Sequence, residues 1–172
     1  DCQAEKIVTQ LFWPMLEKIQ DMRRNDQLTN LAFHYATRLL RLLSDQMQLR
    51  LEQGPDRNRS VLVVTGTDES EELAAQMVTD LCEADGYTVF HIGGGIANDE
   101  IVEEIGNLTV DVLCVFGATP DTVPMTRLLI DRLHELGTAP QVQIVVGGGV
   151  FNRADGLAEE IGADLWAYEP YE

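Results

Sequence analysis

The sequence predicts an α/β domain built on one parallel sheet and preceded by a separate helical segment. In residues 60–167, short β-branched runs alternate with helical stretches, and this pattern is typical of a parallel sheet. Residues 4–51 instead repeat apolar side chains every three or four positions, as amphipathic helices do. A polar stretch beginning at Gly54-Pro55 separates the two patterns. We therefore expect a helical segment over residues 1–54 and an α/β domain over residues 60–172.

The helical segment is expected to contain two helices. The first covers residues 4–23, and Pro14 should kink or divide it, because proline removes one helical hydrogen bond and clashes with the preceding turn. After a polar turn at 24–27, the second helix covers residues 28–51 and stops at Gly54-Pro55. Two helices cannot enclose a core alone, so they must pack on further helices, on the α/β domain or on another subunit.

The α/β domain is expected to contain five strands joined by four helices. The strands are predicted at residues 60–65, 88–92, 112–116, 143–146 and 165–167, and the helices at 71–85, 99–107, 123–136 and 153–161. Five strands in this alternation make a flavodoxin-like, doubly wound parallel sheet. Such sheets bind ligands at the carboxyl ends of their strands, near the point where the winding reverses. The loops that follow the strands are therefore the expected site.

Charge is distributed very unevenly along the chain. The net charge is −17, yet residues 1–60 carry nine Lys and Arg against eight Asp and Glu, whereas residues 61–172 carry three against twenty-one. Such a field repels phosphate backbones, so no direct binding to nucleic acid is expected. The basic residues of the helical segment are interpreted as a solvated helix face. They are Arg23, Arg24, Arg38, Arg41 and Arg50.

Location is predicted from three absences in the sequence. No apolar run reaches the ~18 residues that a membrane span needs, and no basic leader with a cleavage site is present. Cys2, Cys82 and Cys114 lie far apart, without the spacing of a zinc site or of a disulfide framework. We expect a cytoplasmic chain without membrane contact, and we interpret the start at Asp1 as that of a piece of a longer protein.

Several short motifs together suggest a family. They are Asp85-Gly86-Tyr87-Thr88-Val89 leading into Ile92-Gly93, Gly147-Gly148-Gly149 after the fourth strand, Gly162-Ala163-Asp164 before the fifth, and residues 16–34 in the helical segment. In this order and spacing they resemble the cobalamin-binding (corrinoid-binding) domain family, and most of all the modules of photoreceptor-type transcription regulators. The resemblance implies a flavodoxin-like fold behind a partial four-helix bundle, with a corrinoid at the loops.

The sequence departs from this family at the cobalt ligand. The family has an Asp-x-His-x-x-Gly loop after the first strand, and its imidazole replaces the nucleotide base of cobalamin beneath cobalt. Residues 65–74 place Glu71 at the histidine and Ala74 at the glycine. A carboxylate is a hard oxygen donor and a poor substitute for imidazole on cobalt. The resemblance would also place a tryptophan near Arg23 and a glutamate before His34, and only the histidine is present.

The candidate cofactor-binding residues come from the second predicted helix and from the loops after the strands. They are His34, Thr67, Asp68, Ser70, Gly93, Gly94, Ala118, Thr119, Gly147, Gly148 and Gly149. The resemblance implies that the glycines after the fourth strand make room for a nucleotide tail, although tight turns explain both glycine runs equally well. His34 is alternatively a core or interface residue. Asp68, Glu69, Glu71 and Glu72 suit a helix start better than a hard-cation site, and no metal site or catalytic residue is predicted.

Our hypothesis is a sensory or regulatory ligand-binding domain of a bacterial regulator, without enzymatic activity. Its ligand would be cobalamin held without a protein histidine or, second, a heme-like tetrapyrrole. The first alternative is a corrinoid carrier subunit for methyl transfer. The second is a cofactor-free interaction module. For all three interpretations, the helices are expected to form a homo-oligomer.

Overall fold

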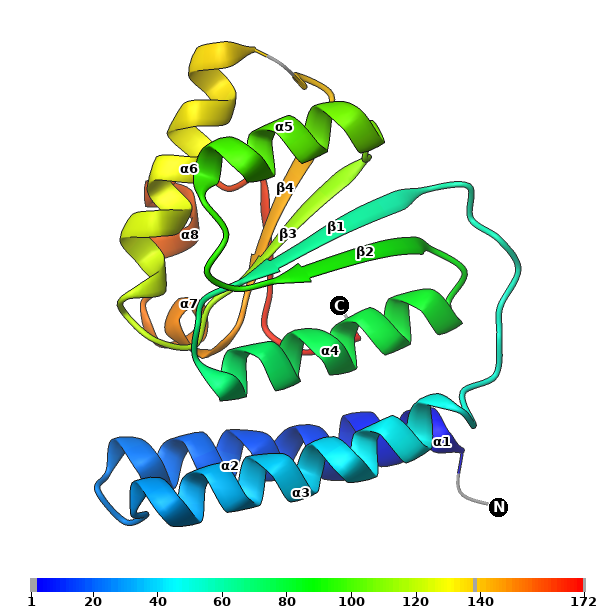
Figure 1. The fold of residues 1–172 in the computed structure, drawn as a ribbon, viewed down its shortest axis with the longest axis vertical. Coiled ribbons are helices and arrows are strands. Elements are labelled where there is room, and N and C mark those ends of the chain that lie inside the picture. The colour runs from blue at the N-terminus through cyan, green and yellow to red at the C-terminus, as the bar shows by residue number, and fades with distance from the viewer. Residues whose placement is uncertain (1–2, 138, 172) are drawn as a thin grey trace.

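The computed structural model describes residues 3–137 and 139–171, and its centre is a five-stranded sheet (Figure 1). The strands are β1 (Ser60–Thr65), β2 (Thr88–Gly93), β3 (Val112–Phe116), β4 (Gln143–Gly147) and β5 (Leu165–Ala167). All pair in parallel, in the order β2-β1-β3-β4-β5. The predicted flavodoxin-like fold is confirmed. The winding reverses between β1 and β3, so the loops after these two strands flank the expected ligand position.

Helices cover both faces of the sheet (Figure 1). In chain order, those of the α/β domain are α4 (Glu69–Ala84), α5 (Asn98–Leu108), α6 (Thr122–Leu136), α7 (Gly149–Arg153) and α8 (Leu157–Glu160). Side chains of β1 divide between two buried clusters. Leu62 and Val64 pack with α5 and α6, whereas Val61 and Val63 pack with α4 and the helical segment. The near-continuous apolar strands follow from burial on both faces.

The helical segment forms a third layer outside α4 (Figure 1). This helical layer consists of α1 (Ala4–Ile7), the π-helical η1 (Val8–Phe12), α2 (Trp13–Arg24) and α3 (Asn30–Gln48). Leu16 and Leu40 of this layer belong to the same buried cluster as Leu73 and Met77 of α4. Of the three packing arrangements left open by the sequence, the structure therefore shows the one against the α/β domain.

Pro14 does mark an irregularity in the first helix. It lies in the first turn of α2, directly after the five π-helical residues of η1. Proline in a helix interior displaces the carbonyl one turn earlier, and a π-helical turn widens the backbone enough to absorb that displacement. The helix therefore continues through Pro14 with altered winding rather than breaking into two separated helices.

Two predicted helix boundaries are wrong. The second helix ends at Gln48 rather than Leu51. The stretch predicted as one helix over residues 153–161 contains only the last residue of α7 and the four residues of α8, because Gly156 adopts the left-handed conformation (φ 78°) between these two helices. Within the described residues, no helix combines the length and apolarity needed to cross a membrane.

Candidate functional site

A cavity of about 760 Å³ lies at the carboxyl ends of β1 and β3, between the loops and the end of α2. We call it the edge cavity. Its lining includes Gly66 to Asp68 after β1, Gly95 to Asn98 after β2, Ala118 to Thr122 after β3, and Gln20, Arg23 and Arg24 from α2. Five predicted site residues are brought together here, namely Thr67, Asp68, Ser70, Ala118 and Thr119. The position agrees with the winding reversal of the sheet.

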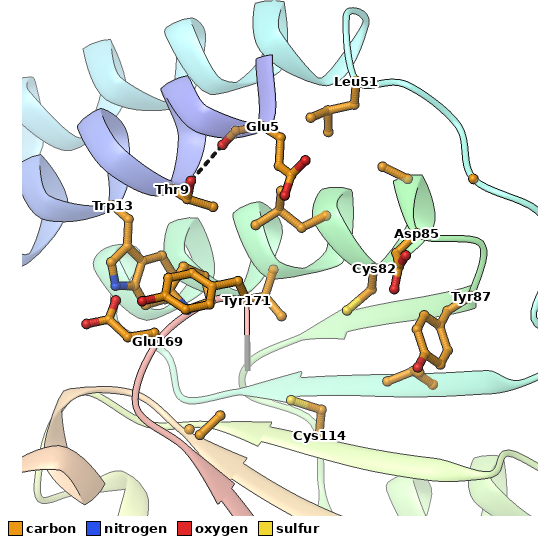
Figure 2. Close-up of a pocket in the computed structure, with 18 of the residues that line it drawn as sticks. Glu5, Thr9, Trp13, Leu51, Cys82, Asp85, Tyr87, Cys114, Glu169 and Tyr171 are labelled. Carbon is orange, nitrogen blue, oxygen red and sulfur yellow. Dashed lines mark hydrogen bonds between the residues drawn. The ribbon is translucent and has the colours of Figure 1, made fainter. Parts of the chain in front are cut away.

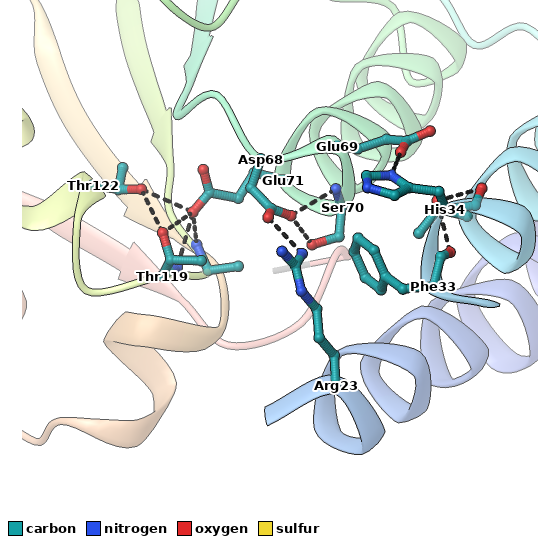
Figure 3. Close-up of polar contacts among 11 residues, drawn as sticks. Arg23, Phe33, His34, Asp68, Glu69, Ser70, Glu71, Thr119 and Thr122 are labelled. Atoms are coloured by element: carbon teal, nitrogen blue, oxygen red, sulfur yellow. Dashed lines mark hydrogen bonds and ion pairs between the residues drawn. The ribbon is translucent and has the colours of Figure 1, made fainter. Parts of the chain in front are cut away.

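Asp68 begins α4 and joins it to the helical layer (Figure 3). One carboxylate oxygen accepts hydrogen bonds from the Ser70 amide (2.9 Å) and hydroxyl (2.5 Å), which caps the helix. The other accepts from Arg23 Nη1 at 2.7 Å. Burial alone would raise the pKa of Asp68, but the bonds from Ser70 and the Arg23 guanidinium lower it overall.

A hydrogen bond and further ion pairs join the helical layer to the first turn of α4. Glu69 Oε2 lies 2.5 Å from His34 Nδ1, and Glu69 Oε1 lies 3.5 Å from Arg38. Arg41 lies 4.0 Å from Glu72. We call these pairs, together with Arg23–Asp68, the interlayer clamp. Arg23 also stacks over the Phe33 ring, 4.0 Å from its centroid.

The clamp corrects two expectations for the helical layer. Arg23, Arg38 and Arg41 do not form a purely solvated face, because each lies within ion-pair distance of an acid of the α/β domain. His34 is half-exposed and does not line the edge cavity; its ring is bound to Glu69 instead (Figure 3). Its predicted role toward a cofactor therefore has no geometric support in this conformation.

Glu71, at the position of the missing histidine, is fully buried. Its Oε1 accepts hydrogen bonds from the amides of Ala118 (2.6 Å) and Thr119 (2.9 Å) and from the hydroxyls of Thr119 (3.2 Å) and Thr122 (2.8 Å). Figure 3 shows the carboxylate directed toward the loop after β3. A Cβ on Gly66 would lie 2.0 Å from Glu71 Oε2 and 2.7 Å from Thr122 Oγ1, so a larger residue there would displace these side chains. Glu71 therefore ties the loop after β1 to the loop after β3.

The sequence did not predict this role for Glu71, which was grouped with the acids of the helix start. A signal existed in the spacing, because Glu71 lies three and four residues before Ala74 and Ala75 and so shares the buried face of α4. Among the described residues, no group of three His, Cys, Asp or Glu side chains could hold a metal ion.

The predicted glycines lie in different places. Gly94 packs against the loop after β1, where a Cβ would meet the Gly66 carbonyl oxygen at 2.0 Å, and Gly93 adopts a positive φ of 71° in open space. Gly149 begins α7 and lies outside both large cavities. Gly147 and Gly148 line a second cavity described next. Most of these glycines therefore serve turns or close backbone packing.

This second cavity, of about 910 Å³, lies on the sheet face near α1 and α4, and we call it the face cavity (Figure 2). Cys82 and Cys114 line it, and burial raises the pKa of Cys114 to about 12, which keeps that thiol protonated. The face cavity shares no lining residue with the edge cavity. Of the predicted site residues, five thus line the edge cavity, Gly147 and Gly148 line the face cavity, and the other four line neither.

Phe116 lies against the glycines after β4 at the carboxyl end of the face cavity. A Cβ on Gly147 would meet its ring at 3.6 Å, an ordinary contact distance, and one on Gly148 would meet it at 2.9 Å and the Gly117 carbonyl oxygen at 2.4 Å. Trp13 of α2 packs edge-on against the same ring, with centroids 6.0 Å apart. Both aromatic rings line the face cavity together with Gly147 and Gly148, so the cavity still reaches these glycines.

The fold and the edge cavity define a ligand-binding module of the doubly wound type, with its site at the winding reversal and a helical layer beside it. The chain belongs to the B12 binding domain family, which matches residues 59–171. The predicted family is thereby confirmed.

Similar proteins include "Dimethylamine corrinoid protein 1" of Methanosarcina acetivorans, with 25% identity over 119 residues, covering 68% of this chain and 55% of that one. "Monomethylamine corrinoid protein 2" of Methanosarcina barkeri has 25% identity over 130 residues, covering 74% and 58%. The structure of the Methanosarcina barkeri monomethylamine corrinoid protein superposes with a TM-score of 0.86 at 20% identity, covering 99% of this chain and 80% of that one. The chain thus spans little more than half the length of the curated relatives it matches.

Cobalamin fits the chain's residues only in part. The edge cavity offers polar and small side chains at the expected position. The carboxylate at the histidine position, however, is turned away into a hydrogen-bond network with the loop after β3. A corrinoid whose cobalt takes an imidazole from the loop after β1 therefore does not fit.

Proposed function

We propose that this chain is a non-catalytic corrinoid-binding module of the carrier type, which holds a corrinoid at the edge cavity with the cofactor's own base on cobalt. The observation that carries the proposal is the set of hydrogen bonds that the Glu71 carboxylate accepts. Its Oε1 already accepts four hydrogen bonds, three from Ala118 and Thr119 in the loop after β3 and one from Thr122 at the start of α6. A side chain held in this way does not take the place of the base beneath cobalt.

The carrier role rests on likeness to the relatives. Those reported above are named as methylamine corrinoid proteins, and they favour the carrier alternative over the sensor of a transcription regulator. A bound corrinoid would supply methyl-transfer chemistry at cobalt. The chain would supply the edge cavity, with Arg23, Thr67 and Thr119 as polar contacts, and a methyltransferase would be its partner.

The test is an absorbance titration of the purified chain with hydroxocobalamin, methylcobalamin and adenosylcobalamin, with hemin as the competing tetrapyrrole. We expect stoichiometric cobalamin binding without loss of the base-on spectrum. Cobinamide, which lacks the nucleotide base, serves as the matched probe. Its spectrum should stay that of a base-free corrinoid after binding, because no side chain replaces the base.

Two results would overturn the proposal. A shift of bound cobinamide to an imidazole-ligated spectrum would show a histidine ligand. Failure of every cobalamin to bind more tightly than roughly 100 μM, a free energy of about −5.5 kcal/mol, would show that the edge cavity is not a corrinoid site.

A further inference from the structure

The α/β domain has few Lys and Arg residues, and one of them pairs with no acid. Residues 61–172 carry three Lys and Arg against twenty-one Asp and Glu. Arg127 pairs with Asp131 at 3.0 Å, and Arg132 pairs with Asp99 at 3.1 Å. Within the described parts of the chain, the third, Arg153, has no carboxylate at ion-pair distance and donates to a backbone carbonyl instead. The ion pairs of the protein therefore do not account for its position.

Arg153 is the last residue of α7 and lies at the boundary with the helical layer. Its Nη2 donates to the Ala118 carbonyl oxygen at 2.7 Å. A Cβ on Gly149 would lie 2.6 Å from Arg153 Nη1 and 3.9 Å from Gln20 Oε1, so both side chains converge on this glycine. Burial, with a smaller contribution from the positive charge of Arg24, lowers the pKa of Arg153. Arg24 and Arg153 are therefore close enough to repel each other across this boundary.

Both arginines line the edge cavity, where the balance of charge differs from that of the chain. The charged residues of its lining are Arg23, Arg24, Arg153, Asp68 and Asp121. Three arginines against two aspartates give this lining a net charge of +1, whereas the whole chain carries −17. Arg23 and Asp68 already pair with each other at 2.7 Å. Positive charge that the protein leaves unpaired thus collects at the expected ligand position.

The arrangement suits an oxyanion. A guanidinium presents parallel N–H donors that match the oxygens of a phosphate or a carboxylate. Arg24 and Arg153 come from different helices, so they approach a shared anion from two directions. A tetrahedral phosphate offers separate oxygens to each guanidinium, whereas a carboxylate offers only two oxygens in one plane. An anion between the two side chains also turns their repulsion into attraction.

We propose that Arg24 and Arg153 form a phosphate-binding subsite on the side of the edge cavity that adjoins α2 and α7. The phosphate has two possible sources, namely the phosphodiester of a bound cobalamin or a free phosphate ion. The chemistry at the two guanidiniums is the same in both cases. The subsite is inferred from the charges of this chain and does not depend on the corrinoid proposal.

The test is calorimetric titration of the chain, without corrinoid, with sodium phosphate at pH 7.5 and at an ionic strength held constant with NaCl. We expect a saturable dissociation constant of about 1 mM, which rises at least about tenfold in Arg24→Gln. Arg24→Lys keeps the charge and should retain most of the affinity. Arg132→Gln is the matched control, because it removes an equal charge from α6 outside the cavity lining, and it should bind phosphate like the wild type.

Arg24→Gln separates lost binding from lost structure, because the Arg24 side chain is exposed and pairs only with Asp21 of its own helix, at 3.4 Å. Circular dichroism on each variant establishes that the fold is retained. Absence of saturable binding by the wild type up to about 20 mM phosphate would overturn the proposal. An equal loss of affinity in Arg132→Gln would also overturn it, since the effect would then follow from net charge and not from a subsite.

Cobalamin and cobinamide distinguish the two sources of the phosphate, because cobinamide lacks the phosphodiester. If the subsite holds the cofactor's phosphate, Arg24→Gln weakens the binding of cobalamin and leaves that of cobinamide unchanged. If it holds a free phosphate ion, the variant loses phosphate binding alone. Phosphate binding by a chain that binds neither corrinoid would support the subsite and contradict only the corrinoid proposal.

Discussion

Glu71 illustrates how a single side chain can exchange one role for another while keeping its position. The position that the family resemblance assigns to an axial imidazole holds a carboxylate that accepts four hydrogen bonds from the loop after β3 and the first residue of α6. The departure was visible in the sequence, but the direction of the side chain was not. The direction of the Glu71 side chain depends on Gly66, Thr119 and Thr122, which come together only when β1 and β3 pair.

Replacing Glu71 should cost stability well beyond that of an ordinary surface acid. Glu71→Ala leaves two buried amides and two hydroxyls without their acceptor, and we expect a loss of about 3 kcal/mol in the free energy of unfolding. Urea denaturation followed by circular dichroism measures it. Glu72→Ala is the matched control, because Glu72 is half-exposed and pairs with Arg41 only at 4.0 Å, and it should change stability by less than about 0.5 kcal/mol. Equal losses in both variants would contradict the assigned role.

Asp80 predicts a pH dependence of stability. Burial, with smaller contributions from the charges of Glu83 and Asp45, raises its pKa from 3.8 to about 6, against a hydrogen bond from Gln76 at 2.7 Å. An acid with a raised folded pKa binds its proton more tightly when folded, so its contribution to stability is lost as pH rises from about 4 to about 6. Asp80→Asn keeps the acceptor oxygen for Gln76 and cannot ionise.

We therefore expect Asp80→Asn to be more stable than the wild type at pH 7.5, by about 1 kcal/mol after allowance for solvent screening, with little difference at pH 4. Denaturation at both pH values measures this, and the difference between the two proteins removes the contribution of nearby His91. A variant less stable than the wild type at pH 7.5 would show that Asp80 is stabilised in its charged form.

At the scale of elements, the sequence predicted all five strands because each is short, apolar and bounded by polar turns. Helix ends were harder to predict. The last predicted helix fails at Gly156, whose backbone adopts the left-handed conformation, and the sequence pattern alone does not show whether a glycine interrupts a helix or lies within it. The packing of the helical layer on α4 depends on contacts between residues far apart in sequence, which periodicity does not report.

The interlayer clamp predicts an energetic coupling between α2 and α4. In a double-mutant cycle of Arg23→Ala and Asp68→Ala, we expect a coupling energy of about 1 kcal/mol, since Asp68 is largely buried and its bond to Arg23 is short. Asp68→Ala alone should cost about 1 kcal/mol more than Arg23→Ala, because it also removes the cap of α4. Urea denaturation of the four proteins measures both quantities. A coupling energy near zero would show that the Arg23–Asp68 pair does not stabilise the packing of α2 on α4.

At the scale of the whole molecule, the sequence predicted the sheet and its family but not the scatter of the candidate residues, of which five line the edge cavity, two line the face cavity and four line neither. Gly147 and Gly148 follow a strand just as Ala118 and Thr119 do, so all four were expected at one site. Which face of the sheet a residue borders is fixed by pairing register, and the sequence of a single strand does not report that register.

The net charge of −17 predicts how the whole chain responds to salt. Screening weakens the repulsion among the acids of the α/β domain, so raising NaCl from 20 to 300 mM should raise the melting temperature by about 3 °C. Differential scanning calorimetry measures the shift, with an uncharged osmolyte at equal osmolality as the control. A fall in melting temperature would mean that the interlayer clamp, which screening weakens, outweighs the repulsion.

The first turn of α4 has a mechanical consequence for the molecule. Within four residues, Asp68 and Glu69 are bound to the helical layer and Glu71 to the loop after β3. A rotation of this turn therefore displaces the helical layer and the loop after β3 together. If a partner or a ligand tilts the helical layer, the tilt is transmitted through this turn to the loop after β3, which forms part of the edge cavity.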